Sequence, residues 1–244
     1  RPGYVYVIDL ATGNAYSDVS TFGAGATNGW LFQTSEPNAF MNSPVTLDST
    51  LNFNVDGVYF GETWYDSTGS VAGDPDSGAG TINWKGKLYK LTIPSVDSNG
   101  DYDPSSPDNY SDNPLDGNTT KAWYMDAYFD ARRPISGSIA LSRDAFGNVW
   151  TYFGTGRYFS EADENNTDTQ YLLGVKDPFF NQDHTGYYHT YPGDAAYPGT
   201  PLLLNHGELL DSGAYAVTPQ GDVFQNGQYF GTWNDLLSAA RQED

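Results

Sequence analysis

Short stretches in which apolar and polar residues alternate recur along the chain, and this pattern predicts β-strands. Residues 58–64 (VYFGETW) and 149–153 (VWTYF) are two examples, and turn-forming Gly, Asn or Asp residues separate such stretches. Only residues 233–240 (WNDLLSAA) have the pattern of a helix, with Asn234 as the predicted N-cap. The sequence therefore predicts an all-β chain, with strands at residues 4–10, 58–64, 87–93, 123–129, 139–142, 149–153, 171–175 and 214–217.

A weak internal repeat indicates how these strands are organised. In residues 44–61 and again in residues 134–154, an apolar stretch that begins with Pro leads through a Gly-containing turn to an aromatic strand ending in Gly. Repeats of this kind are typical of β-propeller blades. A β-sandwich or a jelly roll is the structural alternative. Long polar insertions fall at residues 23–29, 66–80, 97–120 and 181–199, and the one at 97–120 accounts for the wide spacing of the copies.

The expected architecture is a partial β-propeller, a single region over residues 1–244 with about three to four four-stranded blades and long loop insertions. A closed ring usually needs more blades than this, and the chain begins at Arg1 without a methionine. We therefore expect the C-terminal part of a longer protein, whose other segment supplies the missing blades. The blade remnants are expected at about residues 1–20, 40–130, 134–180 and 200–232.

The composition indicates a hydrophobic core and a strongly negative net charge. The 244 residues are 38% hydrophobic and include 19 Tyr, 13 Phe and 6 Trp, enough to bury a sizeable core. The formal net charge is −20, and 25 Asp outnumber 6 Glu. Because Asp favours turns, the acidity is expected mostly in loops. Such a field repels nucleic acids and attracts cations or basic partners, so nucleic-acid binding is not expected.

Two absences in the sequence narrow the classes of protein further. There is no Cys, which excludes disulfides, a thiol nucleophile and Cys-ligated zinc within this sequence, and which fits a bacterial secreted protein. No apolar run approaches the roughly 20 residues of a membrane-spanning helix, so membrane insertion is not expected.

The most distinctive motif is FGTGRY at residues 153–158. Gly154 and Gly156 can end a strand in a tight turn, and Arg157 can pair with an acidic loop, so the motif by itself does not indicate an active site. With its companions it resembles the signature of the C-terminal propeller of the PilY1/PilC proteins of bacterial type IV pili. The resembling positions are Pro134, Ile135, Tyr152, Phe153, Gly154, Thr155, Gly156, Arg157, Tyr158, Asp168, Gln170, Tyr171, Gly174 and Asp177.

The resemblance continues toward the N-terminus and carries functional expectations. Residues 57–61 with residues 86–91 are similar to the preceding blade of that family, although Glu62 stands where an Asp is usual. The resemblance implies a tip adhesin without enzymatic activity, acting in surface adhesion and pilus biogenesis, with an extracellular location at the bacterial cell surface or pilus tip. The implied partners are pilins or minor pilins at the pilus tip, a host or abiotic surface ligand, and the remaining propeller segment of the same protein.

One acidic loop has the ligand spacing of a calcium site. Asp97, Asn99 and Asp101 occupy positions 1, 3 and 5 of a calcium-binding loop, where carboxylate or amide oxygens hold the ion. Asp103 would offer its backbone carbonyl, and Asp108 falls at position 12. Tyr102 departs from this pattern because an EF-hand has Gly at the sixth position, and no helices flank the loop. A solvated acidic turn is the alternative.

Other candidate sites have weaker support. Residues 52–57 and the acidic loop with Asp163, Asn165, Thr167 and Asp168 match a calcium loop less well, and Asp74 and Asp76 are weaker still. His184 and His189 flank a Tyr-Gly-rich loop without identifiable further ligands. No GxSxG, Walker or HExxH motif occurs. The alternatives to an adhesin are a secreted propeller enzyme, carbohydrate-active or quinone-dependent, and a structural cell-surface component.

Overall fold

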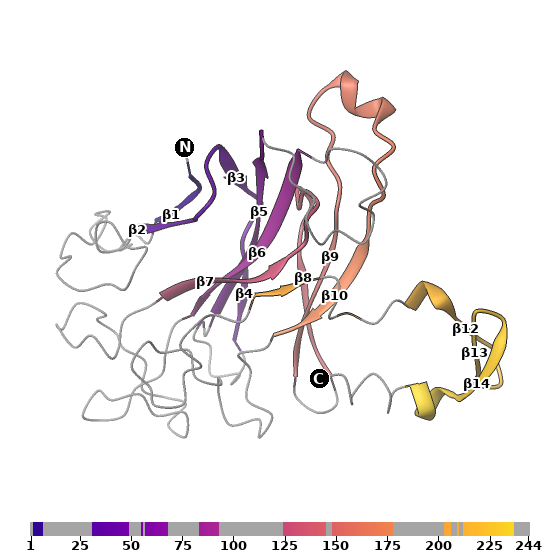
Figure 1. Ribbon diagram of the computed structural model, residues 1–244. Coiled ribbons are helices and arrows are strands. Elements are labelled where there is room, and N and C mark those ends of the chain that lie inside the picture. The colour runs from indigo at the N-terminus through magenta and orange to yellow at the C-terminus, as the bar shows by residue number, and fades with distance from the viewer. Residues whose placement is uncertain are drawn as a thin grey trace, which may run out of the picture. The chain divides into compact units, whose positions relative to one another are not determined.

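The protein is described here by a computed structural model (Figure 1). The structure describes residues 2–6, 31–48, 55, 57–67, 83–92, 124–144, 148–177, 203–205, 209 and 212–236. The chain divides into two compact units, Arg1–Leu204 and Asn205–Asp244. Strands dominate both units, which confirms the predicted all-β class.

The largest sheet of the first unit is built around three long antiparallel strands, β5 (Gly57–Tyr65), β6 (Trp84–Thr92) and β7 (Tyr124–Asp130). Their aromatic and β-branched residues suit a pleated surface that is buried on both sides. The short strands β3 (Ala39–Met41) and β4 (Val45–Leu47) both pair with β5, and β11 (Leu204–Asn205) lies beside β7. The order is therefore β11–β7–β6–β5–β3, with β4 also on β5.

The register of β5 and β6 divides their side chains between two faces. Phe60 is opposite Tyr89, Glu62 is opposite Lys87 and Trp64 is opposite Lys85, and these pairs share one face because side chains alternate along a strand. At its apolar end, this face packs against β1 (Tyr4–Tyr6) and β2 (Leu31–Gln33). The cluster there consists of Phe32, Phe60, Tyr89 and Leu91, with Val5, Met41, Val58, Met125 and Ala127 around it.

The opposite face of β5–β7 packs against a second antiparallel sheet, formed by β8 (Ala140–Arg143), β9 (Val149–Gly154) and β10 (Leu172–Lys176). Phe129 and Phe153 meet edge to face between the sheets, with ring centroids 6.0 Å apart. Both sheets are up-and-down meanders, the form of sheet from which propeller blades are built. The described strands do not close a ring, in agreement with a partial propeller.

A glycine lets the chain cross closely over this second face. The segment between β7 and β8 passes over β6 at Gly86, whose carbonyl accepts a hydrogen bond of 2.9 Å from the N–H of Ala131. A Cβ at Gly86 would lie 2.5 Å from the carbonyl oxygen of Arg133, so no other residue fits without a backbone shift. The N–H of Ile135 then donates to the Thr63 hydroxyl at 2.9 Å. Gly86 therefore fixes how the segment that leads into the second sheet lies on the first.

The second unit contains a small meander of its own, β12 (Tyr215–Val217), β13 (Asp222–Gln225) and β14 (Gln228–Thr232). The short 3-10 helix η4 (Ser212–Ala214) precedes it. Asn226 and Gly227 join β13 to β14 with φ values of 49° and 81°, as a tight hairpin turn requires. The meander thus closes with a turn that residues of these two types favour.

The predicted helix at the C-terminus begins as expected, but its cap was wrongly assigned. Residues 233–236 are helical, and residues 237–240 lie outside the described part of the chain. The Thr232 hydroxyl accepts a bond from the Asp235 N–H at 3.4 Å, and the Asp235 carboxylate accepts the Thr232 N–H at 2.7 Å. This reciprocal arrangement is a capping box, which makes Thr232 the N-cap instead of Asn234.

Candidate functional site

The five predicted calcium ligands, Asp97, Asn99, Asp101, Asp103 and Asp108, lie outside the residues that the structure describes. The strands on either side of them are described. Thr92 at the end of β6 is opposite Tyr124 at the start of β7, so the sheet holds the two ends of the intervening segment next to each other. The calcium loop stays a prediction, anchored at both ends on the central hairpin of the main sheet.

The weaker loop candidates fare differently. Residues 52–54 and 56, Asp74, Asp76, His184 and His189 also lie outside the described part of the chain. Thr63 stands at position 12 of a calcium loop that would start at Asn52, but it is buried in β5 and accepts the Ile135 N–H. Asp163 is likewise committed to a structural role in the segment that joins β9 to β10. Within the described ranges, no three His, Asp or Glu side chains are grouped as a metal site would require.

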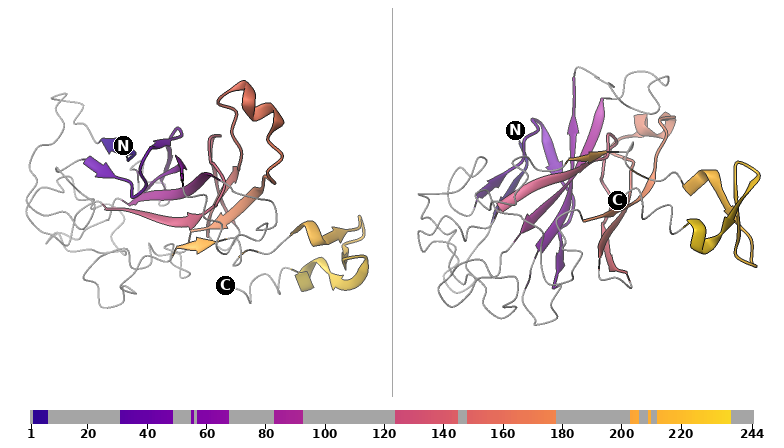
Figure 2. Two further views of the ribbon diagram at one scale, coloured as in Figure 1. Left: turned by 45° about the horizontal axis from the view of Figure 1, so that its top comes forward. Right: turned by 60° about the horizontal axis from the view of Figure 1, so that its bottom comes forward.

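The FGTGRY motif forms the turn out of β9. Gly156 has a φ of 130°, a backbone conformation that other residues rarely adopt, and its N–H donates to the Pro134 carbonyl at 2.8 Å. The Thr155 hydroxyl accepts the Tyr171 N–H at 2.8 Å across the base of the β9–β10 connection. Figure 2 shows that this connection, which carries the 3-10 helix η2 (Glu161–Asn165), projects away from the strands of its sheet.

Arg157 pairs with an acidic loop, as the sequence predicted. Its guanidinium donates to the Asp163 carboxylate and lies 5.0 Å from the centroid of the Trp84 ring. The same carboxylate accepts the backbone N–H groups of Phe159 and Ser160 at 2.8 and 3.0 Å. These backbone bonds, with Arg157 in support, lower the pKa of Asp163. Asp163 therefore caps η2, and the motif residues serve the local fold.

Asp177, another residue of the resemblance, is the centre of a buried ion pair. Its side chain is 0% exposed and accepts hydrogen bonds from Lys90 Nζ and from the Tyr59 hydroxyl, each at 2.6 Å. Its N–H donates to the Val149 carbonyl at 2.8 Å. Asp177 thus connects the end of β10 to β5 and β6. A buried charge is tolerated when it is paired and hydrogen-bonded in this way.

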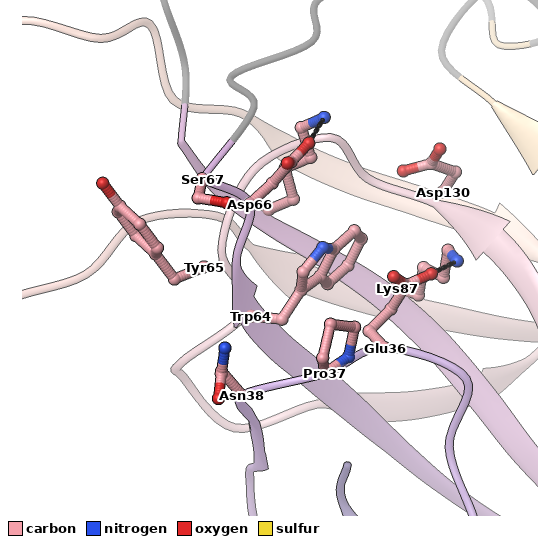
Figure 3. Close-up of a pocket in the computed structure, with 10 residues that line it drawn as sticks. Glu36, Pro37, Asn38, Trp64, Tyr65, Asp66, Ser67, Lys87 and Asp130 are labelled. Atoms are coloured by element: carbon pink, nitrogen blue, oxygen red, sulfur yellow. Dashed lines mark hydrogen bonds and ion pairs between the residues drawn. The ribbon is translucent and has the colours of Figure 1, made fainter. Parts of the chain in front are cut away.

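A polar groove opens on the other face of the main sheet, beyond the apolar cluster (Figure 3). Its volume is about 470 Å³. Trp64 lies between two ion pairs, Lys85 with Asp66 at 2.6 Å and Lys87 with Glu36. We call this feature the ion-paired groove; it is lined by Glu36, Pro37, Asn38, Trp64, Tyr65, Asp66, Ser67, Lys85, Lys87 and Asp130.

The charges around this groove do not balance. Lys87 on β6 is opposite Glu62 on β5 and opposite Asp130 on β7, so the register places one ammonium between two carboxylates. Its ion pair is formed with a third carboxylate, that of Glu36. Asp130 accepts the Arg132 N–H at 3.0 Å and forms no ion pair with any described residue. Carboxylates therefore exceed ammonium groups here.

Glu62 is the buried member of this row. It is 0% exposed, and neither carboxylate oxygen has a hydrogen-bond partner in good geometry, although the hydroxyls of Thr34 and Tyr89 face it. Burial raises the pKa of Glu62 to about 7, and the nearby Glu36 carboxylate adds to this effect. The Thr34 and Tyr89 hydroxyls and, least of all, Lys87 act in the opposite direction. Glu62 therefore titrates near neutral pH.

Sequence reasoning did not find the ion-paired groove. Lys85 and Lys87 look like ordinary outward residues of an amphipathic strand, and only the strand register places Lys87 between Glu62 and Asp130. One weak signal was present, since Glu62 is an acid in the middle of an otherwise aromatic strand. Acidic side chains are almost never fully buried unless they are paired, so an acid at this position of a buried strand indicates an unusual environment.

Comparisons with known proteins give one match. No family model and no curated protein sequence matches the chain. Among solved structures, the chain is similar to the C-terminal domain of PilY1 from Pseudomonas aeruginosa, with a TM-score of 0.45 and 15% sequence identity. The match covers 94% of this chain and 43% of the PilY1 chain, so this chain spans less than half the length of that structure.

A likeness at this TM-score adds nothing about ligands or partners, and the all-β class rests on this chain's own strand pairing. No helix within the described residues is long and apolar enough to span a lipid bilayer.

Proposed function

We propose that this chain is a calcium-binding β-propeller region of a type IV pilus-associated tip adhesin similar to PilY1, without enzymatic activity of its own. It acts at the bacterial cell surface or pilus tip, in surface adhesion and pilus biogenesis. The observation that carries the proposal is the FGTGRY motif at residues 153–158 together with its companions Tyr171 and Asp177.

The contacts of these residues support this use of the resemblance. Gly156 bonds to the Pro134 backbone, Thr155 bonds to Tyr171, and Asp177 joins Lys90 inside the protein. Positions that lie far apart in the sequence therefore contact one another in one structural unit. A chance similarity of a short motif would not require its distant companions to do so.

Calcium is proposed to bind through Asp97, Asn99 and Asp101, the backbone carbonyl of Asp103, and Asp108. The β6–β7 pairing at Thr92 and Tyr124 supports a binding loop there, because the sheet has already met the entropy cost of bringing the ends of the segment together. Calcium would neutralise carboxylates that otherwise repel one another and would order the loop. Calcium occupancy would thus modulate the surface offered to a partner.

Adhesion is proposed to involve pilins or minor pilins on one side and a host or abiotic surface on the other. A pull-down with purified pilins and minor pilins, in calcium and then in a calcium chelator, tests the pilus half of this proposal. Retention that falls when calcium is removed is the expected result. Equal and negligible retention in both buffers would contradict the pilus assignment.

A secreted propeller enzyme, carbohydrate-active or quinone-dependent, is the competing class. The two differ in a simple measurement, because an enzyme of this class would turn over glycans or carry a bound quinone chromophore. Glycan hydrolysis or quinone absorbance in the purified full chain would replace the adhesin proposal. A third class, a structural cell-surface component, would bind neither pilins nor a surface ligand in a calcium-dependent way.

A further inference from the structure

The ion-paired groove has the size and walls of a binding site. Its volume of about 470 Å³ lies within the range of small-ligand sites. Glu36, Pro37 and Asn38 form one wall, and Asn38 has a φ of 56°, in the left-handed region that Asn tolerates better than most residues. Figure 3 shows Trp64 between the two ion pairs, with the Asp130 carboxylate apart from both of them.

We propose that the ion-paired groove binds the cationic side chain, lysine or arginine, of a basic peptide segment. The first reason is the charge of its lining. Glu36, Asp66 and Asp130 contribute three carboxylates, against the two ammonium groups of Lys85 and Lys87. Because both ammonium groups are already used in ion pairs, Asp130 is the carboxylate that a new cation would meet.

The second reason is the surroundings of Lys87. Lys87 pairs with Glu36 and lies opposite Asp130 in the strand register, so one ammonium serves two carboxylates of the lining, and a second cation would offset the charge that Lys87 leaves. An anionic ligand would instead have to displace a carboxylate from Lys85 or Lys87. The net balance of the site therefore favours cations.

The third reason is that an aromatic ring in this groove already attracts an ammonium. Lys87 Nζ lies 5.1 Å from the centroid of the Trp64 ring, in the geometry of a cation–π contact. A guanidinium or ammonium entering the groove would meet the carboxylate of Asp130, which lies opposite Lys87 in the register, with the net charge of −20 steering it from a distance.

Isothermal titration of the full chain with two capped peptides tests the proposal. One peptide is Gly-Gly-Arg-Gly-Gly, and the other has citrulline in place of Arg, which removes the charge and keeps the shape. We expect measurable affinity for the arginine peptide, weakened by salt, and at least about tenfold weaker binding of the citrulline peptide. Equal binding of both peptides, or binding of neither, would overturn the proposal.

Variants with opposite expected effects make the test specific. Asp130→Asn should weaken arginine-peptide binding about tenfold, and Lys87→Met, which removes the competing ammonium, should strengthen it. Glu161→Gln removes the same charge as Asp130→Asn from exposed η2 and should change the affinity by less than about twofold. Circular dichroism establishes that each variant is folded. An Asp130→Asn affinity equal to that of Glu161→Gln, or binding of neutral saccharides in preference to the arginine peptide, would contradict the assignment.

Discussion

Both faces of the β5–β6 hairpin carry buried charged residues, but the arrangement of ammonium and carboxylate groups differs between the two faces. On the face toward β8–β10, Lys90 forms a buried ion pair with Asp177, and that carboxylate also accepts a hydrogen bond from the Tyr59 hydroxyl. On the other face, Lys87 is shared among Glu36, Glu62 and Asp130. The matched pair stabilises the packing of two sheets. The unmatched row leaves a pH-sensitive acid and a groove with negative charge to spare.

Breaking the matched pair should have the largest effect on stability. Lys90→Met leaves the Asp177 side chain 0% exposed and without its ammonium, so we expect a loss of about 3–5 kcal/mol in the free energy of unfolding. Urea unfolding followed by tryptophan fluorescence measures this loss. As the matched control, Lys85→Met removes a partly exposed ion pair and should cost at most about 1 kcal/mol. Equal losses in unfolding free energy for both variants would mean that the buried Lys90–Asp177 pair stabilises the fold no more than a partly exposed pair does.

On the face that carries Glu62, Lys87 and Asp130, we expect the free energy of unfolding to depend on pH. Glu62 has a pKa of about 7 in the folded protein and an ordinary value of 4.5, so the folded state binds the proton more tightly. Its contribution to stability is complete below pH 4.5 and is lost as the pH rises through 7. The full loss is roughly 3 kcal/mol. Unfolding free energies at pH 5 and pH 8 should therefore differ more in the wild type than in Glu62→Gln.

Two residues serve to check that pH prediction. Burial raises the pKa of Asp126 to about 6, so part of the pH dependence should persist in Glu62→Gln. Glu161→Gln, an exposed control, should retain the whole wild-type dependence. If Glu62→Gln kept the wild-type slope between pH 5 and pH 8, the buried carboxyl would not be the group that titrates.

The smallest effect on stability is expected at Asp130. It is half-buried and accepts only the Arg132 N–H among the described residues, so Asp130→Asn should shift the free energy of unfolding by no more than about 0.5 kcal/mol. Urea unfolding under the same conditions measures the shift. A loss comparable to that of Lys90→Met would place Asp130 in the structural framework and remove the contrast between the two faces.

The sequence predicted the long strands well because their burial leaves a strong pattern. The predicted strands at 58–64 and 149–153 match β5 and β9 to within one residue at each end. The strand predicted at 87–93 begins earlier, at Trp84, because the register continues to the pairing of Trp84 with Tyr65. The ends of such strands depend on pairing with residues far away in the sequence, so the local sequence pattern does not predict them.

The local sequence pattern could not predict the short strands or the ion-paired groove. β2 and β3 have three residues each, too few for a period to be recognised, and they form because β1 and β5 offer free edges. The pairing of Arg157 with an acidic loop was predicted, since both partners lie a few residues apart. The row of Glu62, Lys87 and Asp130 comes from three strands and follows only from their register.

The central claim, a calcium-binding propeller region of an adhesin, depends most directly on the loop between β6 and β7. Isothermal titration of the full chain with calcium should detect one site, lost in Asp97→Ala and Asp101→Ala and kept in the exposed-acid control Glu161→Ala. Magnesium should compete poorly, because Mg²⁺ demands near-ideal octahedral geometry and gives up its water ligands reluctantly. Equal calcium uptake by the wild type and all three variants, or none by the wild type, would contradict the claim.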